Sequence, residues 1–277
     1  MSHRAAAAGS SEVAEGRGGP LLTLTTDFGL RDHYVGVMKG VIAGIAPEVG
    51  VIDITHDVPA FSIPEGAFAI LQAYRWFPSG TAHVVVVDPG VGSHRNAVAA
   101  RAGGHVFVAP DNGVLSFVFE RHPEFEVRAI DTRHGLAEIS RTFHGRDLFA
   151  PAAARLMAGL RFDQVGPRVR EPVMLHSMEP TARRGRVLHV DRFGNLVTNF
   201  RAGQLGSREG LQLGSASVFV RVESYAEAPA GDPFLIEGSS GYLEVSANRA
   251  SAAQLLGVRA GAEIAICPPD GGNSREP

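Results

Sequence analysis

The sequence of 277 residues is 44% hydrophobic and 20% charged and carries a formal charge of −3, values typical of a globular protein with no general attraction to nucleic acid or to an anionic membrane. Its one cysteine, Cys267, can form neither an intramolecular disulfide nor a Cys-x-x-Cys motif, and no apolar run reaches the roughly 20 residues of a membrane helix. We therefore expect a cytoplasmic protein that binds neither nucleic acid nor membrane.

The chain from Leu21 to about Leu160 alternates strand-like apolar runs with helical patterns. The patterns predict strands at 21–26, 49–54, 83–87 and 105–109 and helices at 34–46, 65–77, 114–121 and 146–160. This alternation is typical of an α/β fold with a mostly parallel sheet and helices on both faces. We assign residues 20–168 to this N-terminal α/β domain and expect residues 1–19 to be a disordered tail.

The pattern changes beyond Val165, where short strand-like pieces replace the alternation. They lie at 186–190, 195–200, 218–222, 233–236 and 242–246, with one helical pattern at 250–256. Many short strands with little helix are typical of a small β-rich domain. We assign residues 169–270 to it and residues 271–277 to a C-terminal tail.

Polar side chains follow each predicted strand of the first half. The carboxyl ends of parallel strands meet at one edge of a sheet, and ligands bind at that edge. These loops therefore predict a ligand site there. Any single aspartate in them is also a common turn or helix-cap residue. The residues concerned are Asp27 and Asp32 after the first strand, Asp53 after the second, Asp88 after the third and Asp111 after the fourth, with His144 before the last helix.

Known phosphate-binding motifs do not fit these loops. No Gly-x-x-x-x-Gly-Lys is present, and TTDFGLRDHY stands where a dinucleotide fingerprint would follow the first strand. The carboxylates favour a cationic or hydroxyl-rich ligand. We expect no metal, because no His-x-x-x-His pair or zinc-type His/Cys cluster occurs. A magnesium site made by Asp27, Asp32, Asp53 and Asp88 is the open alternative.

Seven segments of the chain together resemble a known enzyme family. In order they are TTDFGLRDHYVGVMKG, DITHDVP, VVVVDPGVGSHR, APDNGVL, TFHGRDLFAPAAA, DRFGNLVTN and GSSGYLEVSAN. From Leu22 to Ile266 the chain resembles the S-adenosyl-L-methionine (SAM) hydrolases, also called SAM hydroxide adenosyltransferases, which are relatives of the SAM-dependent fluorinase and chlorinase. The resemblance implies a C-terminal β-barrel domain and a homotrimer with sites between neighbouring subunits. It also implies that SAM, as substrate, and water give adenosine and L-methionine without cofactor or metal.

The resemblance implies three catalytic residues, Asp88, Arg95 and His144. Halogenases of this group have a tyrosine in place of the aspartate and Tyr-Ser or Tyr-Gly in place of His-Gly, so this chain sides with the hydrolases. Water is a weak nucleophile, and either Asp88 or His144 would take its proton, a contribution of about 10²- to 10⁴-fold in rate. Arg95 would keep Asp88 ionised, and that charge would repel a halide.

The resemblance also implies substrate contacts in both predicted domains. Asp27 would accept both ribose hydroxyls, and Asp32 and Asp191 would bind the methionine ammonium group. The other substrate-binding residues are Ser239 and Ser240 for the methionine carboxylate, Asn195 for the adenine edge, Phe61 and Tyr225 for the faces of the nucleoside, and Phe193 and Asn248.

Three positions depart from the family pattern. Asn96 stands where a second arginine often follows Arg95, His94 is an additional titratable group, and Gly238 stands where an asparagine usually precedes Ser-Ser-Gly. These departures concern substrate positioning rather than the reaction. Two alternatives stay open: a halogenase or another adenosyl-transferring enzyme, and a SAM- or adenosine-binding protein with negligible turnover.

Overall fold

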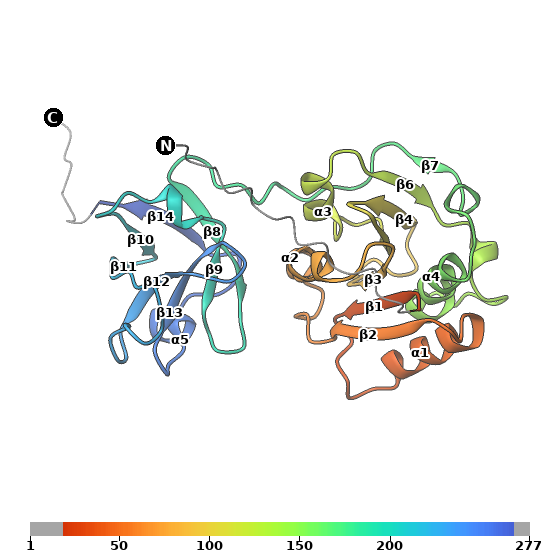
Figure 1. The fold of residues 1–277 in the computed structure, drawn as a ribbon, viewed down its shortest axis with the longest axis horizontal. Coiled ribbons are helices and arrows are strands. Elements are labelled where there is room, and N and C mark those ends of the chain that lie inside the picture. Colours follow the sequence, from red (N-terminus) through yellow and green to blue (C-terminus); the bar gives the residue numbers. More distant parts are fainter. Residues whose placement is uncertain (1–18, 269–277) are drawn as a thin grey trace, which may run out of the picture.

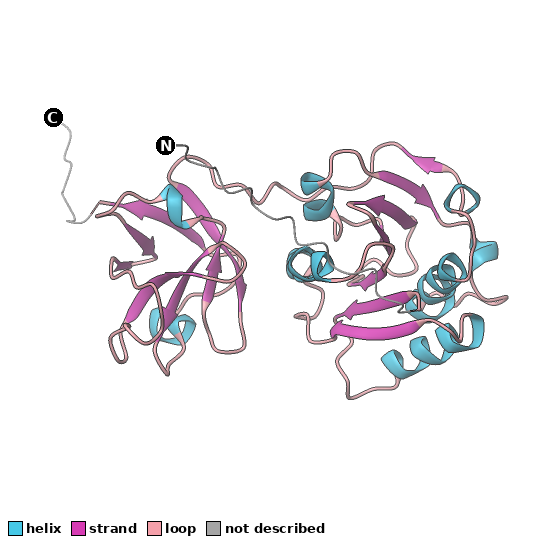
Figure 2. Ribbon diagram, in the orientation of Figure 1, coloured by secondary structure: helices cyan, strands magenta, loops and turns pink. Residues whose placement is uncertain are grey.

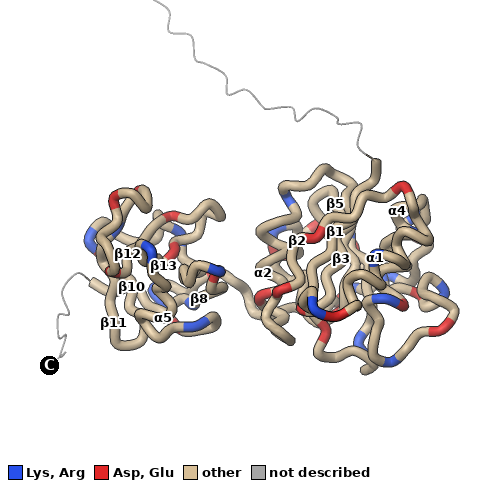
Figure 3. Tube along the Cα trace, turned by 90° about the horizontal axis from the view of Figure 1, so that it is seen from below, with Lys and Arg blue, Asp and Glu red and all other residues tan. Residues whose placement is uncertain are grey.

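The computed structural model describes residues 19–268. It contains two seven-stranded sheets, one built from residues up to Val169 and the other from Arg184 onward (Figures 1 and 2). The expected tails, 1–19 and 271–277, lie outside the described residues apart from Gly19, as do residues 269–270. Basic and acidic residues are interspersed over both parts (Figure 3), in agreement with the small formal charge of −3.

The first sheet has the strand order β2-β1-β3-β5-β4-β6-β7. Its strands are β1 (Leu21–Thr26), β2 (Gly50–Thr55), β3 (Ala82–Val86), β4 (Ala97–Ala102), β5 (His105–Pro110), β6 (Glu126–Ala129) and β7 (Arg168–Val169). The α-helices of this part of the chain are α1 (Tyr34–Ile45), α2 (Ile63–Ala73), α3 (Ser116–Arg121) and α4 (Ala150–Met157). It also contains the 3₁₀ turns η1 (Tyr74–Trp76), η2 (Thr132–His134) and η4 (Phe162–Gln164) and the π-helical turn η3 (Gly145–Phe149).

The α/β class is confirmed, but the sheet is mixed rather than mostly parallel. Strands β2, β1, β3 and β5 run parallel, whereas β4, β6 and β7 pair antiparallel with their neighbours. The sequence prediction missed β4, whose alanine-rich AVAARA has weak strand propensity. It turns into β5 through Gly103 and Gly104, both with positive φ, as a two-residue hairpin requires.

Helices cover both faces of this sheet, as predicted. The valines of β3 and the residue after it alternate between the two hydrophobic cores: Val84 and Val86 pack with α1 and α4, and Val85 and Val87 pack with α2 and α3. Successive side chains of a strand point to opposite faces, so an unbroken valine run is buried only when both faces are covered. This packing holds the carboxyl end of β3, where Asp88 follows, in a fixed place.

The second sheet is antiparallel, in the order β11-β10-β14-β8-β9-β13-β12. Backbone hydrogen bonds from the segment after β11 to Leu235 on β12 bring its two edges together, so the sheet is nearly closed and the predicted barrel is confirmed. Its elements are β8 (Arg184–Val190), β9 (Leu196–Thr198), β10 (Gly210–Leu213), β11 (Ala216–Val218), β12 (Pro233–Glu237), β13 (Leu243–Ala247), β14 (Glu263–Cys267), α5 (Ala252–Leu256) and η5 (Ala202–Gln204).

The two parts meet where α2 packs against β8. Glu65 on α2 lies 2.7 Å from Nδ1 of His189, and the ring centroids of Phe68 and Tyr242 are 6.0 Å apart.

Within residues 19–268, no helix has the length and apolar character needed to cross a membrane.

A buried histidine on β3 makes the stability of the fold depend on pH. His83 is fully buried, with Nδ1 2.7 Å from Thr23 Oγ1 and Nε2 3.2 Å from His105 Nδ1. Burial lowers the pKa of His83 from 6.5 to about 3. Between these values the unfolded chain binds a proton that the folded chain excludes, so we expect the unfolding free energy to fall by about 1.4 kcal/mol per pH unit as the pH decreases.

Urea denaturation across that pH window measures the slope. The His83→Asn variant keeps a polar group beside Thr23 and removes the titrating ring, so its slope should be shallower by about the same 1.4 kcal/mol per pH unit. A slope unchanged by the substitution would contradict the assignment to His83.

Candidate active site

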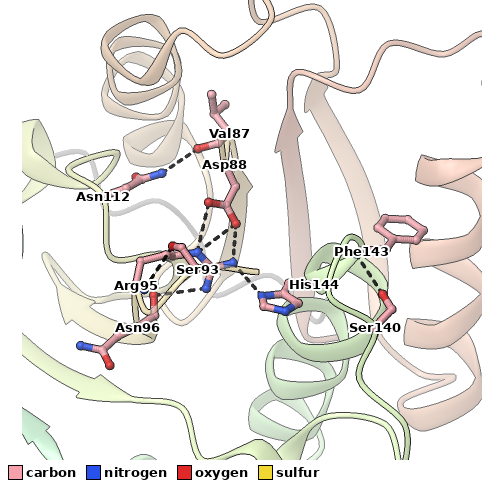
Figure 4. A network of polar contacts seen from close by, with 9 residues as sticks. All are labelled: Val87, Asp88, Ser93, Arg95, Asn96, Asn112, Ser140, Phe143 and His144. Carbon is pink, nitrogen blue, oxygen red and sulfur yellow. Dashed lines mark hydrogen bonds and ion pairs between the residues drawn. The ribbon is translucent and has the colours of Figure 1, made fainter. Parts of the chain in front are cut away.

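The three predicted catalytic residues meet at the carboxyl edge of the first sheet (Figure 4). Asp88 follows β3, Arg95 lies in the loop before β4, and His144 lies directly before η3. Arg95 Nε lies 3.1 Å and 3.0 Å from the two carboxylate oxygens of Asp88, and its Nη2 also donates to Oδ2. The same Nη2 lies 2.8 Å from His144 Nδ1. Arg95 therefore links the carboxylate to the imidazole.

The chain brings these loops together through a glycine. Gly92 has a φ of +78°, and a Cβ there would lie 2.3 Å from the carbonyl oxygen of Arg141. Only glycine fits both the backbone angle and the approach. The loop that carries Asp88 and Arg95 can thus pack against the segment that leads to His144, while Asn112 Nδ2 donates to the carbonyl oxygen of Val87 at 2.9 Å and holds the end of β3.

The ion pair at the centre of the site is shielded from solvent. The side chains of Asp88 and Arg95 are 5% and 10% exposed, and the guanidinium carbon of Arg95 lies 5.2 Å from the ring centroid of Phe149. The carboxylate and the guanidinium stabilise each other in this shielded place, because either one alone would be a buried charge without compensation. The pairing accordingly fixes the orientation of the carboxylate.

His144 is a neutral ring in this arrangement. Burial lowers its pKa below the ordinary 6.5, and the charge of Arg95 lowers it further, while Asp88 and Asp147 oppose the shift. A guanidinium can only donate hydrogen bonds, so Nδ1 of His144 accepts from Arg95 and the proton of the neutral ring is on Nε2. The lone pair of Nδ1 is therefore already used.

Asp147 supports the turn that carries His144, and the sequence interpretation did not identify it. Its fully buried carboxylate accepts from the backbone N–H of Ser140 at 2.9 Å and from Arg146 Nη2 at 3.0 Å. Burial raises its pKa, but the hydrogen bonds from Arg146 and Ser140 outweigh that effect and hold the pKa below 3.8. An acidic residue in the first turn after His-Gly was the available signal.

The residue predicted to bind the ribose follows the strand next to β3. Asp27 follows β1, which pairs parallel with β3 through Thr26 and Val86, so Asp27 and Asp88 extend from the same edge of the sheet. Asp27 Oδ2 accepts from the backbone N–H of Phe61 at 2.9 Å, so the structure brings two predicted substrate residues together. Asp32 is exposed in the segment before α1.

Most of the other predicted substrate residues line one cavity of the second part. Its volume is about 680 Å³, and all of its lining residues come from the second part of the chain. Ser240 and Asn248 are not among these lining residues; the side chain of Asn248 donates instead to the carbonyl oxygen of Ala228 at 3.5 Å. The predicted residues that line the cavity are Asp191, Phe193, Asn195, Tyr225 and Ser239.

Asp191 already has partners inside its own turn. One carboxylate oxygen accepts from the backbone N–H groups of Phe193 and Asn195 at 2.9 Å and 2.8 Å, and the other accepts from the side chain of Asn195 at 2.8 Å. The carboxylate thus shapes the Phe-Gly-Asn turn. Within one chain, the predicted substrate residues form two groups, one at the edge of the first sheet and one around this cavity.

The alternative of a magnesium site finds no support in the described residues. No cluster of three or more His, Cys, Asp or Glu side chains arranged to hold a metal is found among residues 19–268. Asp88 is paired with Arg95, and Asp53 with Lys39 at 2.6 Å.

Models of a single protein family match both parts of the chain. The N-terminal domain model of the SAM hydroxide adenosyltransferases matches residues 22–166, and the C-terminal domain model of the same family matches residues 185–265. Among solved structures, an uncharacterized conserved protein from Thermotoga maritima superposes with a TM-score of 0.83 at 37% identity, covering 89% of this chain and 99% of that one.

Relatives with two different names are similar to this chain. An (R)-S-adenosyl-L-methionine hydrolase from Thermus thermophilus is 38% identical over 87% of this chain and 97% of its own, and one from Methanocaldococcus jannaschii is 34% identical over 86% and 92%. A fluorinase from Actinoplanes sp. is 28% identical over 90% and 98%. The chain belongs to the SAM hydroxide adenosyltransferase family.

Proposed function

We propose that the protein hydrolyses SAM to adenosine and L-methionine by in-line attack of water on ribose C5′. The observation that carries the proposal is the buried Asp88 carboxylate, held by Arg95, which in turn binds His144. The relatives named (R)-S-adenosyl-L-methionine hydrolase, at 34% to 38% identity, support the same reaction.

The chemistry of SAM explains why a carboxylate suits this site. Attack on C5′ forms a carbon–oxygen bond to water and breaks the carbon–sulfur bond, whose electron pair returns to sulfur as a neutral thioether. The leaving group therefore needs no acid. The water needs a base as its oxygen becomes positive, and general base catalysis contributes about 10²- to 10⁴-fold in rate.

We assign to Asp88 the role of the base that takes the proton of the attacking water. His144 Nδ1 accepts from Arg95, so this nitrogen is not free to act as the base. Asp88 accepts hydrogen bonds from Arg95 but keeps further lone pairs on its two oxygens. In this division of roles, His144 orients Arg95 and Arg95 orients the carboxylate, and the proton passes from Asp88 to solvent after the product forms.

The neutral state of His144 predicts an acid limit to activity. Protonation would place a hydrogen on Nδ1 against the Arg95 guanidinium, so turnover should fall as the pH decreases through the pKa of His144, which lies below 6.5. We expect His144→Gln, whose amide oxygen can accept from Arg95, to keep part of the activity and to lose that limb. Measurement of kcat against pH for both proteins tests this, and an identical acid limb in the variant would contradict it.

Product analysis tests the proposed reaction. Purified protein is incubated with SAM, with and without excess chloride, and adenosine, methionine and 5′-chloro-5′-deoxyadenosine are separated by chromatography. Adenosine and methionine in equal amounts, unchanged by chloride, support hydrolysis. The fluorinase relatives make a halogenase the second candidate, and a chlorinated nucleoside would favour it. Absence of any product above background would leave a binding protein.

The substrate site is further proposed to be completed by a neighbouring subunit of a homotrimer. The catalytic residues extend from the first sheet, whereas the cavity that contains Phe193 is lined by the second part alone. Co-expression of Asp88→Asn with Phe193→Asp chains tests this, since Phe193 is 76% exposed and its replacement spares the core. Recovered activity supports shared sites. A monomer in sedimentation, or no recovery, would oppose them.

The remaining expectations belong to the same proposal. The reaction as written uses SAM as substrate and calls for no cofactor or metal. A cytoplasmic location agrees with the single cysteine, which needs no oxidising compartment.

A further inference from the structure

A chain of polar contacts connects the loop after β2 to the loop that carries Asp27. His56 is 4% exposed, and its Nδ1 lies 2.9 Å from Thr26 Oγ1. Its Nε2 lies 3.1 Å from Asp53 Oδ1, and the other oxygen of Asp53 accepts from Lys39 Nζ at 2.6 Å. Lys39 is the only lysine in the sequence. The catalytic steps proposed above use none of Lys39, Asp53 and His56.

Donors and acceptors can be assigned along this series of contacts, which ends on Asp53 from both sides. Asp53 Oδ1 lies 3.1 Å from Nε2 without meeting the geometry of a hydrogen bond, and its negative charge favours the His56 proton on that nitrogen; Nδ1 is then the acceptor for the Thr26 hydroxyl. Thr26 Oγ1 then has a lone pair for the backbone N–H of Phe28, which lies at 3.2 Å. Burial raises the pKa of Asp53, but the hydrogen bond from Lys39 and the nearby His56 ring outweigh that effect and keep the pKa below 3.8, consistent with an ionised acceptor.

Asp27 lies between the two residues that this chain of contacts restrains. Thr26 precedes it and Phe28 follows it, and Phe28 N–H donates to Thr26 Oγ1 across it. The two loops also bond directly: Gly29 N–H donates to the carbonyl oxygen of His56 at 2.8 Å, and Phe61 N–H donates to the Asp27 carboxylate at 2.9 Å. The position of the carboxylate is thus tied to the imidazole of His56.

We propose that His56, oriented by Asp53 and Lys39, is a positioning residue that sets the Asp27 carboxylate for recognition of a vicinal diol on the ribose of the substrate. The inference rests on the proposed function for the identity of the ribose ligand. His56 has no contact with the reacting atoms in this role; it acts through Thr26 and the backbone on each side of Asp27. A misplacement of about 1 Å at such a contact is enough to cost up to about 10²-fold.

The test compares ligands with and without the diol. The dissociation constants of adenosine and 2′,3′-dideoxyadenosine are measured by calorimetry, and their ratio reports the contribution of the diol. We expect His56→Ala to weaken adenosine binding by about 10- to 100-fold and to leave dideoxyadenosine binding nearly unchanged, so that the preference for adenosine falls. KM for SAM should rise more than kcat falls. His56→Asn, which keeps an acceptor near Thr26, should restore part of the preference for adenosine.

Two further variants keep the test decisive. Lys39→Met changes a side chain that is 39% exposed and should reduce the ratio to a smaller extent, so it decides the matter if His56→Ala does not fold. Asp57→Asn alters an exposed carboxylate on the same loop and should match the wild type. A wild-type ratio in folded His56→Ala, or in Lys39→Met where His56→Ala fails to fold, would overturn the proposal. Since the binding ratio needs no turnover, failure of the hydrolase proposal would be seen separately, in product analysis.

Discussion

An Asp88→Asn protein is expected to bind adenosine with near wild-type affinity while its kcat for SAM hydrolysis falls by about 10²- to 10⁴-fold. The amide has nearly the same shape as the carboxylate, and its oxygen can still accept a hydrogen bond from Arg95 Nε, which lies 3.1 Å and 3.0 Å from the two oxygens of Asp88. It cannot take a proton from water. Initial rates from product chromatography give kcat, and adenosine titration by calorimetry gives the dissociation constant.

A matched control separates this effect from a general change of charge. Asp163 is a surface carboxylate, 59% exposed and paired with Arg161, and Asp163→Asn should leave both numbers unchanged. Equal losses of adenosine affinity and turnover in Asp88→Asn would show that Asp88 organises the site rather than handling the water. Undiminished turnover would remove it from the mechanism.

The Arg95→Met substitution is expected to have the largest effect on stability. It leaves the Asp88 carboxylate, whose side chain is 5% exposed, without its cation. Removal of one partner from a buried ion pair costs about 3 to 5 kcal/mol in unfolding free energy, because the other charge stays buried and uncompensated. Turnover should be lost as well, since the carboxylate is no longer oriented. Urea denaturation of the purified variant measures the change.

The double variant Asp88→Asn/Arg95→Met isolates the cause of that loss. With no charge left in the pocket, its unfolding free energy should exceed that of Arg95→Met alone. Arg161→Met is the surface control, because the pair with Asp163 is 69% and 59% exposed and such pairs contribute about 1 kcal/mol or less. If the double variant loses as much unfolding free energy as Asp88→Asn and Arg95→Met lose together, a buried, unpaired charge is not the cause of the instability.

The parts of the fold that follow from periodicity were predictable. The helix expected at 34–46 is Tyr34–Ile45, and the strand expected at 83–87 is Ala82–Val86, since apolar spacing marks both strongly. The helix expected at 146–160 is divided into η3 and α4. Strand β4 was missed because AVAARA carries little strand signal, and its pairing depends on the turn at Gly103 and Gly104 and on neighbours distant in the sequence.

The candidate site shows a similar division. Residue patterns alone predict a ligand site where the strands end, and the family resemblance supplies the roles of Asp88, Arg95 and His144, which now lie in contact. The protonated nitrogen of His144 follows from which of its two ring nitrogens faces Arg95, and no sequence motif contains that information. The sequence does place an acidic residue in the turn after His-Gly, but the hydrogen bond from Ser140 to Asp147 is found only in the folded geometry. The roles assigned to the substrate residues stay predictions.

Hydrolysis of SAM in water enriched in H₂¹⁸O tests whether water attacks ribose C5′. Mass spectrometry of both products shows which carbon–sulfur bond was broken and where the oxygen entered. We predict adenosine that carries the heavy isotope in its 5′-hydroxyl and methionine that carries none. Unlabelled nucleoside, or cleavage that leaves sulfur attached to C5′, would contradict it.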